Sequence, residues 1–150
     1  MLKHTIARIG RSLSVSSLAF GISEAIKDLI EYNPRLYSAN RDFLDVIVSS
    51  ADILTETIRE IWNLKPGGYA KTLWICFPNR ATRHPLKSDI CLRIRTEKHP
   101  PLDIELAHVS IDKVYNPRAF AWRMIYLDSP SREELERKCR DLLREERGWI

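Results

Sequence analysis

The chain has 150 residues, the usual length of one domain with its own hydrophobic core. Hydrophobic residues make up 44% and charged residues 29% of the chain, a composition that excludes an intrinsically disordered protein. The net charge of +4 makes the protein basic, and no apolar run approaches the length of about 18 to 20 residues that a membrane-spanning helix requires.

The first 23 residues carry no acid and several serines, and their basic residues are Lys3, Arg8 and Arg11. Apolar residues recur there at near-helical spacing, which predicts an amphipathic first helix. Three interpretations remain open: an ordinary helix packed on the core, a mitochondrial targeting segment, or a membrane-binding helix whose basic residues face anionic lipid. The apolar positions are Leu2, Ile6, Ile9, Leu13 and Phe20.

Residues 24–64 have the periodicity of helices. A first amphipathic stretch from Ile22 must end at Asn33 and Pro34, because proline lacks the amide hydrogen that a helix interior needs. We expect the next helix to be capped by Ser38 or Asn40. It carries the clearest apolar stripe of the chain, formed by Phe43, Ile47, Ala51, Leu54, Ile58 and Ile61.

After a turn at residues 65–68 the apolar period changes from about 3.6 to 2, which predicts strands over residues 69–77, 88–96 and 102–106. We expect them to pair as an antiparallel meander, with Trp74, Arg93 and Arg95 on one side of the sheet. The alternation slips near residue 109, which indicates a bulge or bend. A fourth strand within residues 120–127 is apolar enough to be central or covered on both faces.

The last predicted element is a helix within residues 129–147, for which Ser129 or Ser131 is a suitable N-cap. The expected fold class is therefore α+β: N-terminal helices packed on a roughly four-stranded antiparallel meander sheet and closed by a C-terminal helix. We expect a single domain over residues 1–150, with a helical part at 1–64 and the sheet at 65–128. The stripe of the last helix is Leu135, Cys139, Leu142 and Leu143.

Three cysteines, Cys76, Cys91 and Cys139, occur without the CxxC spacing of a metal or redox motif. An odd number of cysteines without such spacing predicts free thiols in a reducing compartment, and hence an intracellular, cytoplasmic protein. A mitochondrial location is the alternative that the basic N-terminus leaves open.

No motif of a nucleotide-binding loop, a zinc hydrolase or a serine hydrolase occurs, so we predict no cofactor and no bound metal. Asp89, Asp103 and Glu105 offer the carboxylates of a Mg²⁺ site, but salt bridges across the strands to Arg93 and Arg95 are the simpler expectation.

An enzyme is the least favoured class of function. Its pocket would lie between the helices and the sheet, lined by Trp62, Trp122 and Tyr126. The acid or base in that pocket would be Asp103, Glu105 or His108.

The most informative feature is a basic segment, residues 65–99, in which eight Lys or Arg residues stand against two acids, with aromatic residues between them. This composition favours an anionic partner. We predict a non-enzymatic interaction protein that binds nucleic acid, RNA or DNA, with Trp74 stacking on bases. The residues expected to contact phosphates are Arg80, Arg83, Lys87, Arg93 and Arg95.

The same residues have a purely structural interpretation. Trp74 is then covered, and Arg93 and Arg95 are neutralised by Glu105 and Asp103 across the strands.

A second functional hypothesis is a peripheral membrane protein, either a matrix-like structural protein or an adaptor. It would bind an anionic membrane surface through Lys3, Arg8 and Arg11. Exposed strand edges also favour self-association into a homo-oligomer.

Overall fold

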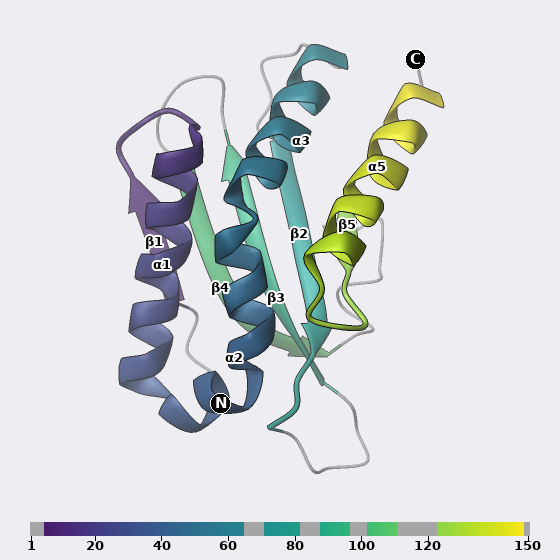
Figure 1. Ribbon diagram of the computed structural model, residues 1–150. Coiled ribbons are helices and arrows are strands. Elements are labelled where there is room, and N and C mark those ends of the chain that lie inside the picture. Colours follow the sequence, from purple (N-terminus) through teal and green to yellow (C-terminus); the bar gives the residue numbers. More distant parts are fainter. Residues whose placement is uncertain (1–4, 65–70, 82–87, 97–101, 111–122, 149–150) are drawn as a thin grey trace.

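The computed structural model of the protein describes residues 5–64, 71–81, 88–96, 102–110 and 123–148. These residues form four helices and five strands (Figure 1). In chain order the elements are β1 (Thr5–Ile9), α1 (Val15–Tyr32), α2 (Pro34–Ser49), α3 (Ala51–Leu64), β2 (Lys71–Pro78), β3 (Ser88–Thr96), β4 (Leu102–Ser110), β5 (Met124–Tyr126) and α5 (Arg132–Gly148).

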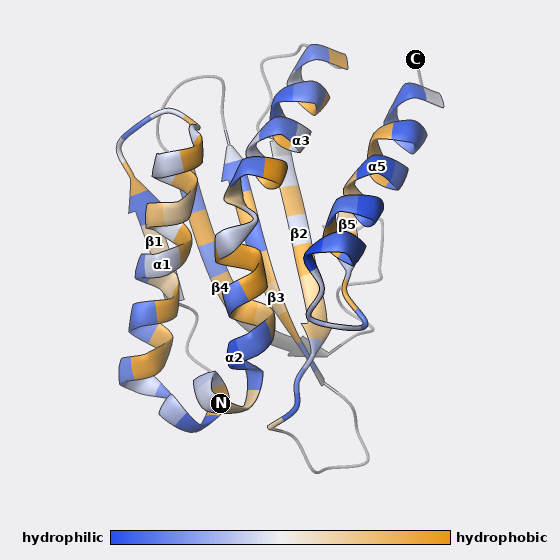
Figure 2. Ribbon diagram, viewed as in Figure 1, coloured by the Kyte–Doolittle hydropathy of each residue, from blue (hydrophilic) through white to orange (hydrophobic). Residues whose placement is uncertain are grey.

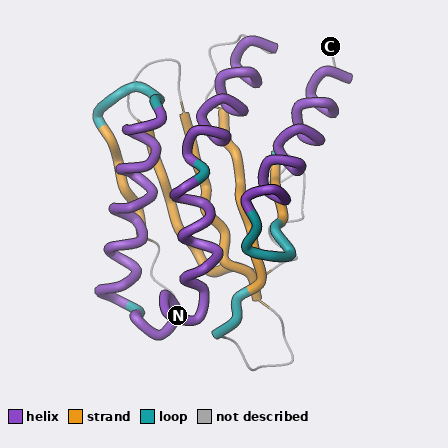
Figure 3. Tube along the Cα trace, in the orientation of Figure 1, coloured by secondary structure: helices purple, strands orange, loops and turns teal. Residues whose placement is uncertain are grey.

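The strands form one sheet in the order β1-β4-β3-β2-β5. All neighbouring pairs are antiparallel except β2 and β5, which run parallel. The α+β class is therefore confirmed, but the four-stranded antiparallel meander is wrong, because the sheet is mixed and has five strands. The helices lie together on one face of this sheet (Figure 3).

The first described part of the predicted N-terminal amphipathic helix is a strand, β1, rather than a helix. Ala7 and Ile9 are buried towards the helices, whereas Arg8 points to the other face and donates to Asp103 on β4 at 3.0 Å. Such alternation is the period of a strand. Helix α1 begins only at Val15, and Phe20, which the helical spacing placed on the apolar stripe, is 57% exposed.

Helix α1 is capped by Ser14, whose hydroxyl accepts a hydrogen bond from the Ser17 amide at 3.0 Å. It ends before Asn33, as the Asn33-Pro34 pair predicts. Asn33 then caps α2, since its side-chain oxygen accepts from the Leu36 amide at 3.2 Å. The expected caps, Ser38 and Asn40, lie inside α2, because proline is already tolerated in the first turn of a helix.

The predicted apolar stripe after residue 40 is confirmed, although two helices carry it. The helix is interrupted at Ser50, so the apolar stripe continues from α2 into α3 and stays within the core (Figure 2). Its members are all buried: Phe43, Ile47, Ala51, Leu54, Ile58 and Ile61.

Helix α1 approaches the sheet most closely at Gly21. Gly21 is buried where α1 crosses Ile9 and Ile104, and a Cβ at this position would lie 2.3 Å from the Ile104 Cδ1 atom. Only glycine fits without moving a buried side chain, because interiors are close-packed.

The pairing of β2, β3 and β4 follows the predicted pattern. Trp74 lies opposite Arg93, and Arg93 lies opposite Glu105, all on the face turned away from the helices. The β3–β4 register runs unbroken from Ser88 and Ser110 to Thr96 and Leu102, so the expected bulge near residue 109 is absent from these described residues.

The strand expected within residues 120–127 is short and lies at the sheet edge. Its described part, β5, pairs with β2 alone among the described strands, so it is not central. Residues 120–122 lie outside the described part of the chain.

Helix α5 covers the β5 side of the sheet. Ser131 is its cap, with its hydroxyl accepting from the Glu134 amide at 3.3 Å. Leu135, Cys139 and Leu142 are buried as predicted, and Leu143 is half-buried.

A buried ion pair ties α5 to the start of β5. The Arg123 Nε atom donates to the Glu146 carboxylate at 2.5 Å, and both side chains are only 5% exposed. Removing one charge of such a pair is costly, because the other is left uncompensated in the interior.

We therefore expect Glu146→Gln to lower the free energy of unfolding by about 3 to 5 kcal/mol, because the buried Arg123 charge then loses the Glu146 carboxylate. Urea denaturation followed by circular dichroism measures the change. Glu145→Gln, at the exposed neighbouring position of α5, is the matched control and should stay within about 0.5 kcal/mol of the unaltered protein. An equal loss of unfolding free energy in the two variants would contradict the stabilising role of the Arg123–Glu146 pair.

Candidate polyanion-binding site

Arg80, the first of the predicted phosphate contacts, lies just after the end of β2. Two asparagines hold it: the Asn40 side-chain nitrogen donates to the Asn79 side-chain oxygen at 3.0 Å, and the Asn40 oxygen accepts from the Arg80 amide at 3.0 Å. Asn40 is almost wholly buried on α2, so α2 and the end of β2 are joined by satisfied polar groups.

The guanidinium of Arg80 is held over an aromatic ring. Its central carbon lies 4.6 Å from the centre of the Phe43 ring, and Phe43 stacks on Phe77 with ring centres 4.8 Å apart. Arg80 also forms an ion pair with Asp42 on α2. Its side chain remains partly exposed, so the remaining guanidinium donors can reach a ligand.

A cavity of about 550 Å³ opens beside Arg80, between the start of α2 and the end of β2. A second arginine, Arg35, lines it from α2 and has no ion-pair or hydrogen-bond partner among the described residues. No carboxylate is among the described residues that line the cavity, which are Arg35, Ala39, Arg80 and Ala81.

Arg83 and Lys87, the next predicted contacts, lie outside the described residues. They follow Arg80 by three and seven positions in the sequence.

The other predicted contacts lie on the face of the sheet turned away from the helices. Arg93 donates to Glu105 at 2.7 Å, and Arg95 is exposed opposite Asp103, which accepts from Arg8. Trp74 is only 7% exposed and packs with two cysteines, so its ring offers little surface for stacking. The structure thus does not gather these residues and Arg80 on one surface.

Arg35 could not be predicted as part of the site, because no linear pattern relates it to Arg80, 45 positions later. The Asn40–Asn79 hydrogen bond is what brings the two segments together. A buried polar contact between distant segments has no periodicity that a sequence pattern can reveal.

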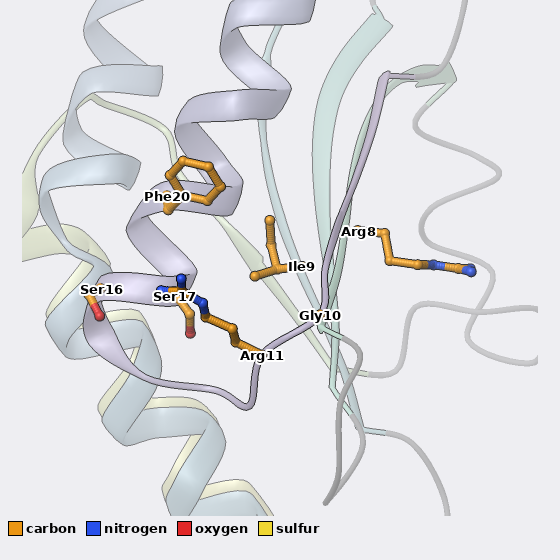
Figure 4. Close-up of a pocket in the computed structure, with 7 residues that line it drawn as sticks. All are labelled: Arg8, Ile9, Gly10, Arg11, Ser16, Ser17 and Phe20. Carbon is orange, nitrogen blue, oxygen red and sulfur yellow. The ribbon is translucent and has the colours of Figure 1, made fainter.

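A second cavity, of about 590 Å³, lies between the end of β1 and the start of α1 (Figure 4). Arg11 and Phe20 lie on its helix side, whereas Arg8 extends towards the opposite side of the strand. Of the predicted membrane contacts, Lys3 lies outside the described residues and Arg8 is paired with Asp103.

A third hollow, of about 300 Å³, has the opposite charge. It lies between α3 and α5, and Asp52, Glu56, Glu60 and Glu136 line it together with Arg140. Each of these four carboxylates forms an ion pair with an arginine, so this hollow suits a phosphate less well than the cavity beside Arg80.

The described residues offer little support for catalysis. Trp62 donates to Thr96 on the helix side, whereas Tyr126 donates to Asp89 on the other face, so these two do not line the single pocket expected of an enzyme. Trp122 and the His108 side chain are not described. No group of three His, Cys, Asp or Glu residues able to hold a metal occurs in the ranges that the structure describes.

The buried cysteines are poor nucleophiles in this structure. Burial raises the pKa of the Cys139 thiol to about 11, so the thiol stays protonated at neutral pH. The neighbouring Cys91 thiol, together with burial, raises the pKa of Cys76 well above its ordinary value.

None of the helices in the described ranges is both long and apolar enough to cross a membrane. No protein-family model matches the sequence, and no curated protein and no solved structure matches the chain.

We expect Asn40→Ala to destabilise the protein by about 1 to 3 kcal/mol, because it removes the acceptor of the Arg80 amide and one of the donors to the Asn79 side-chain oxygen. Chemical denaturation measures this loss. Asn63→Ala, an exposed position near the end of α3, is the control and should be nearly neutral. Equal stability of the two variants would show that the asparagine contact does not hold the end of β2.

Proposed function

We propose that this protein is a non-enzymatic polyanion-binding protein and that its ligand is nucleic acid, RNA or DNA. The observation that supports this proposal is the cavity of about 550 Å³ in which Arg35 and Arg80 face the same space. Two guanidinium groups with no carboxylate among the described lining residues suit phosphate, because arginine donates to its oxygens in a bidentate manner.

The fixed position of Arg80 adds to the argument. Its backbone is held by Asn40 and its guanidinium by Phe43, so little conformational freedom is lost when a phosphate binds. Arg83 and Lys87 then extend the contact along the same strand of nucleic acid. Trp74, Arg93 and Arg95 have no part in the proposal, since Trp74 is buried and Arg93 is paired with Glu105.

Binding through phosphates alone would be sensitive to salt and indifferent to base sequence. The described side chains of the cavity include no aromatic ring for stacking and no amide for reading adenine, so the proposal rests on phosphate contacts made by the two arginines.

A specific observation also favours the second hypothesis, attachment to an anionic membrane. Val15 and Phe20 are exposed on α1, and Phe20 shares a cavity with Arg11. An apolar side chain beside a cation is the combination that interfacial binding uses. Ile9, which the sequence offered for this role, is buried in the core and does not contribute. Cytoplasmic location and self-association through a sheet edge remain predictions.

We expect Arg35→Ala/Arg80→Ala to weaken binding of a single-stranded oligonucleotide and to reduce the slope of log K against log salt by about 1.4, since each phosphate contact contributes about 0.7. Fluorescence anisotropy over a salt series measures both. The control, Arg59→Ala/Arg137→Ala, removes the same charge from arginines on α3 and α5 and should leave most of the binding intact.

Anionic vesicles form a parallel arm of this experiment, with Arg11→Ala/Phe20→Ala as the variant. Loss of vesicle binding in that variant, without oligonucleotide binding in the unaltered protein, would favour the membrane hypothesis. Absence of binding to both ligands at low salt would exclude both hypotheses.

A gain of affinity is expected from Asp42→Asn, because Asp42 competes with phosphate for the Arg80 guanidinium. The matched control is Asp45→Asn, which makes the same charge change three positions later on α2, where the partner is Arg41 at 3.6 Å. The same anisotropy titration, at one salt concentration, compares the two variants. If they gain equally, net charge rather than the Arg80 site sets the affinity.

A further inference from the structure

Two of the three cysteines meet in the middle of the sheet. Cys76 on β2 lies directly opposite Cys91 on β3 in the antiparallel register, on the face turned away from the helices. Both are fully buried, and both are free thiols in this structure. A pair so placed is a candidate for a covalent bond, whereas the third cysteine, Cys139, lies on α5.

The direction of the backbone hydrogen bonds decides what kind of cross-strand pair this is. The Cys76 carbonyl accepts from the Leu127 amide at 2.8 Å, just after β5, and so points away from β3. The amide and carbonyl of one strand residue point to the same side, so Cys76 and Cys91 form a non-hydrogen-bonded pair. In such pairs the Cα atoms are about 4.5 Å apart and the side chains are closest.

That separation matches the requirement of a disulfide. Disulfide-bonded cysteines have Cα atoms about 4.4 to 6.8 Å apart, so closing the bond requires side-chain rotation and little movement of the strands. Cys76 and Cys91 already pack in one buried cluster with Trp74.

We propose that Cys76 and Cys91 are a reversible redox site, which closes a cross-strand disulfide when the protein meets a small-molecule disulfide such as oxidised glutathione. The thiolate of one cysteine attacks the oxidant, forms a mixed disulfide and releases one glutathione thiol. The second cysteine then attacks the mixed disulfide and releases the other. The protein loses two protons and two electrons, which together are two hydrogen atoms, and the oxidant is reduced to two thiols.

Access to the sulfurs depends on β5. Met124 and Tyr126 pack on the cysteine pair, and the Tyr126 hydroxyl donates to Asp89 at 2.9 Å. Strand β5 has only three residues and pairs with β2 alone among the described strands, so its separation from β2 breaks few backbone hydrogen bonds. Oxidation therefore requires this edge to open, and the raised pKa of the buried Cys76 thiol slows it further.

The disulfide would have a mechanical effect on the segment between the two cysteines. Arg80, Arg83 and Lys87 lie between the two cysteines in the sequence, so the bond would join the two strands that flank these residues. The proposed disulfide does not depend on what these residues bind, because the geometry of the two thiols alone supports the inference.

The test uses the full chain with Cys139→Ala, which leaves only the proposed pair. Incubation with oxidised glutathione should give a product lighter by two hydrogen atoms, without a glutathione adduct, and dithiothreitol should reverse it. Intact-mass spectrometry measures the product, and thermal unfolding of the oxidised form should show a raised Tm. Tyr126→Ala in the same background should speed the reaction several-fold.

The matched controls are Cys76→Ser and Cys91→Ser in the same background, which should give a stable glutathione adduct or no product, and never the loss of two hydrogen atoms. If the Cys139→Ala chain does not fold, peptide mapping of the oxidised unaltered protein provides the same answer through a linked 76–91 fragment. The proposal is overturned by a stable adduct in the Cys139→Ala protein, by a disulfide between chains, or by no reaction even with Tyr126→Ala.

Discussion

Burial of one aliphatic face of the sheet beneath the helices is the interaction on which the rest of this structure depends. Every described strand contributes alternate residues to that face, among them Ile75 on β2, Leu92 on β3 and Ile104 on β4. Because side chains alternate along a strand, burying this face forces the intervening residues to the other side. The charged pair Arg93–Glu105 and the thiols of Cys76 and Cys91 lie there for that reason.

The elements with strong local patterns were predictable. The stripe from Phe43 to Ile61 repeats over about five turns of helix, and the alternation in β3 and β4 placed Arg93 beside Glu105 correctly. Strand β1 was missed because its five residues are too few to separate a period of 3.6 from a period of 2, and its partner is far away in the sequence. The parallel pairing of β5 with β2 was missed because these two strands are also far apart in the sequence.

The candidate site was predictable only in part. Arg80 belongs to a charge cluster that composition alone reveals, whereas Arg35 is an isolated arginine on a helix. Their meeting at one cavity depends on how α2 lies against the end of β2, which is a tertiary contact. The burial of Trp74 is likewise a property of packing, since the residue alternates in the sequence just as an exposed one would.

The position of β1 has a consequence for protein synthesis. Arg8 and its partner Asp103 are 95 positions apart, so the ribosome releases β1 long before β4 exists. During that interval Ala7 and Ile9 have no sheet to join, while α1, α2 and α3 can already form from local contacts. The charge of Arg8 within the unpaired β1 segment then disfavours pairing with a neighbouring nascent chain, as charged residues do at natural sheet edges.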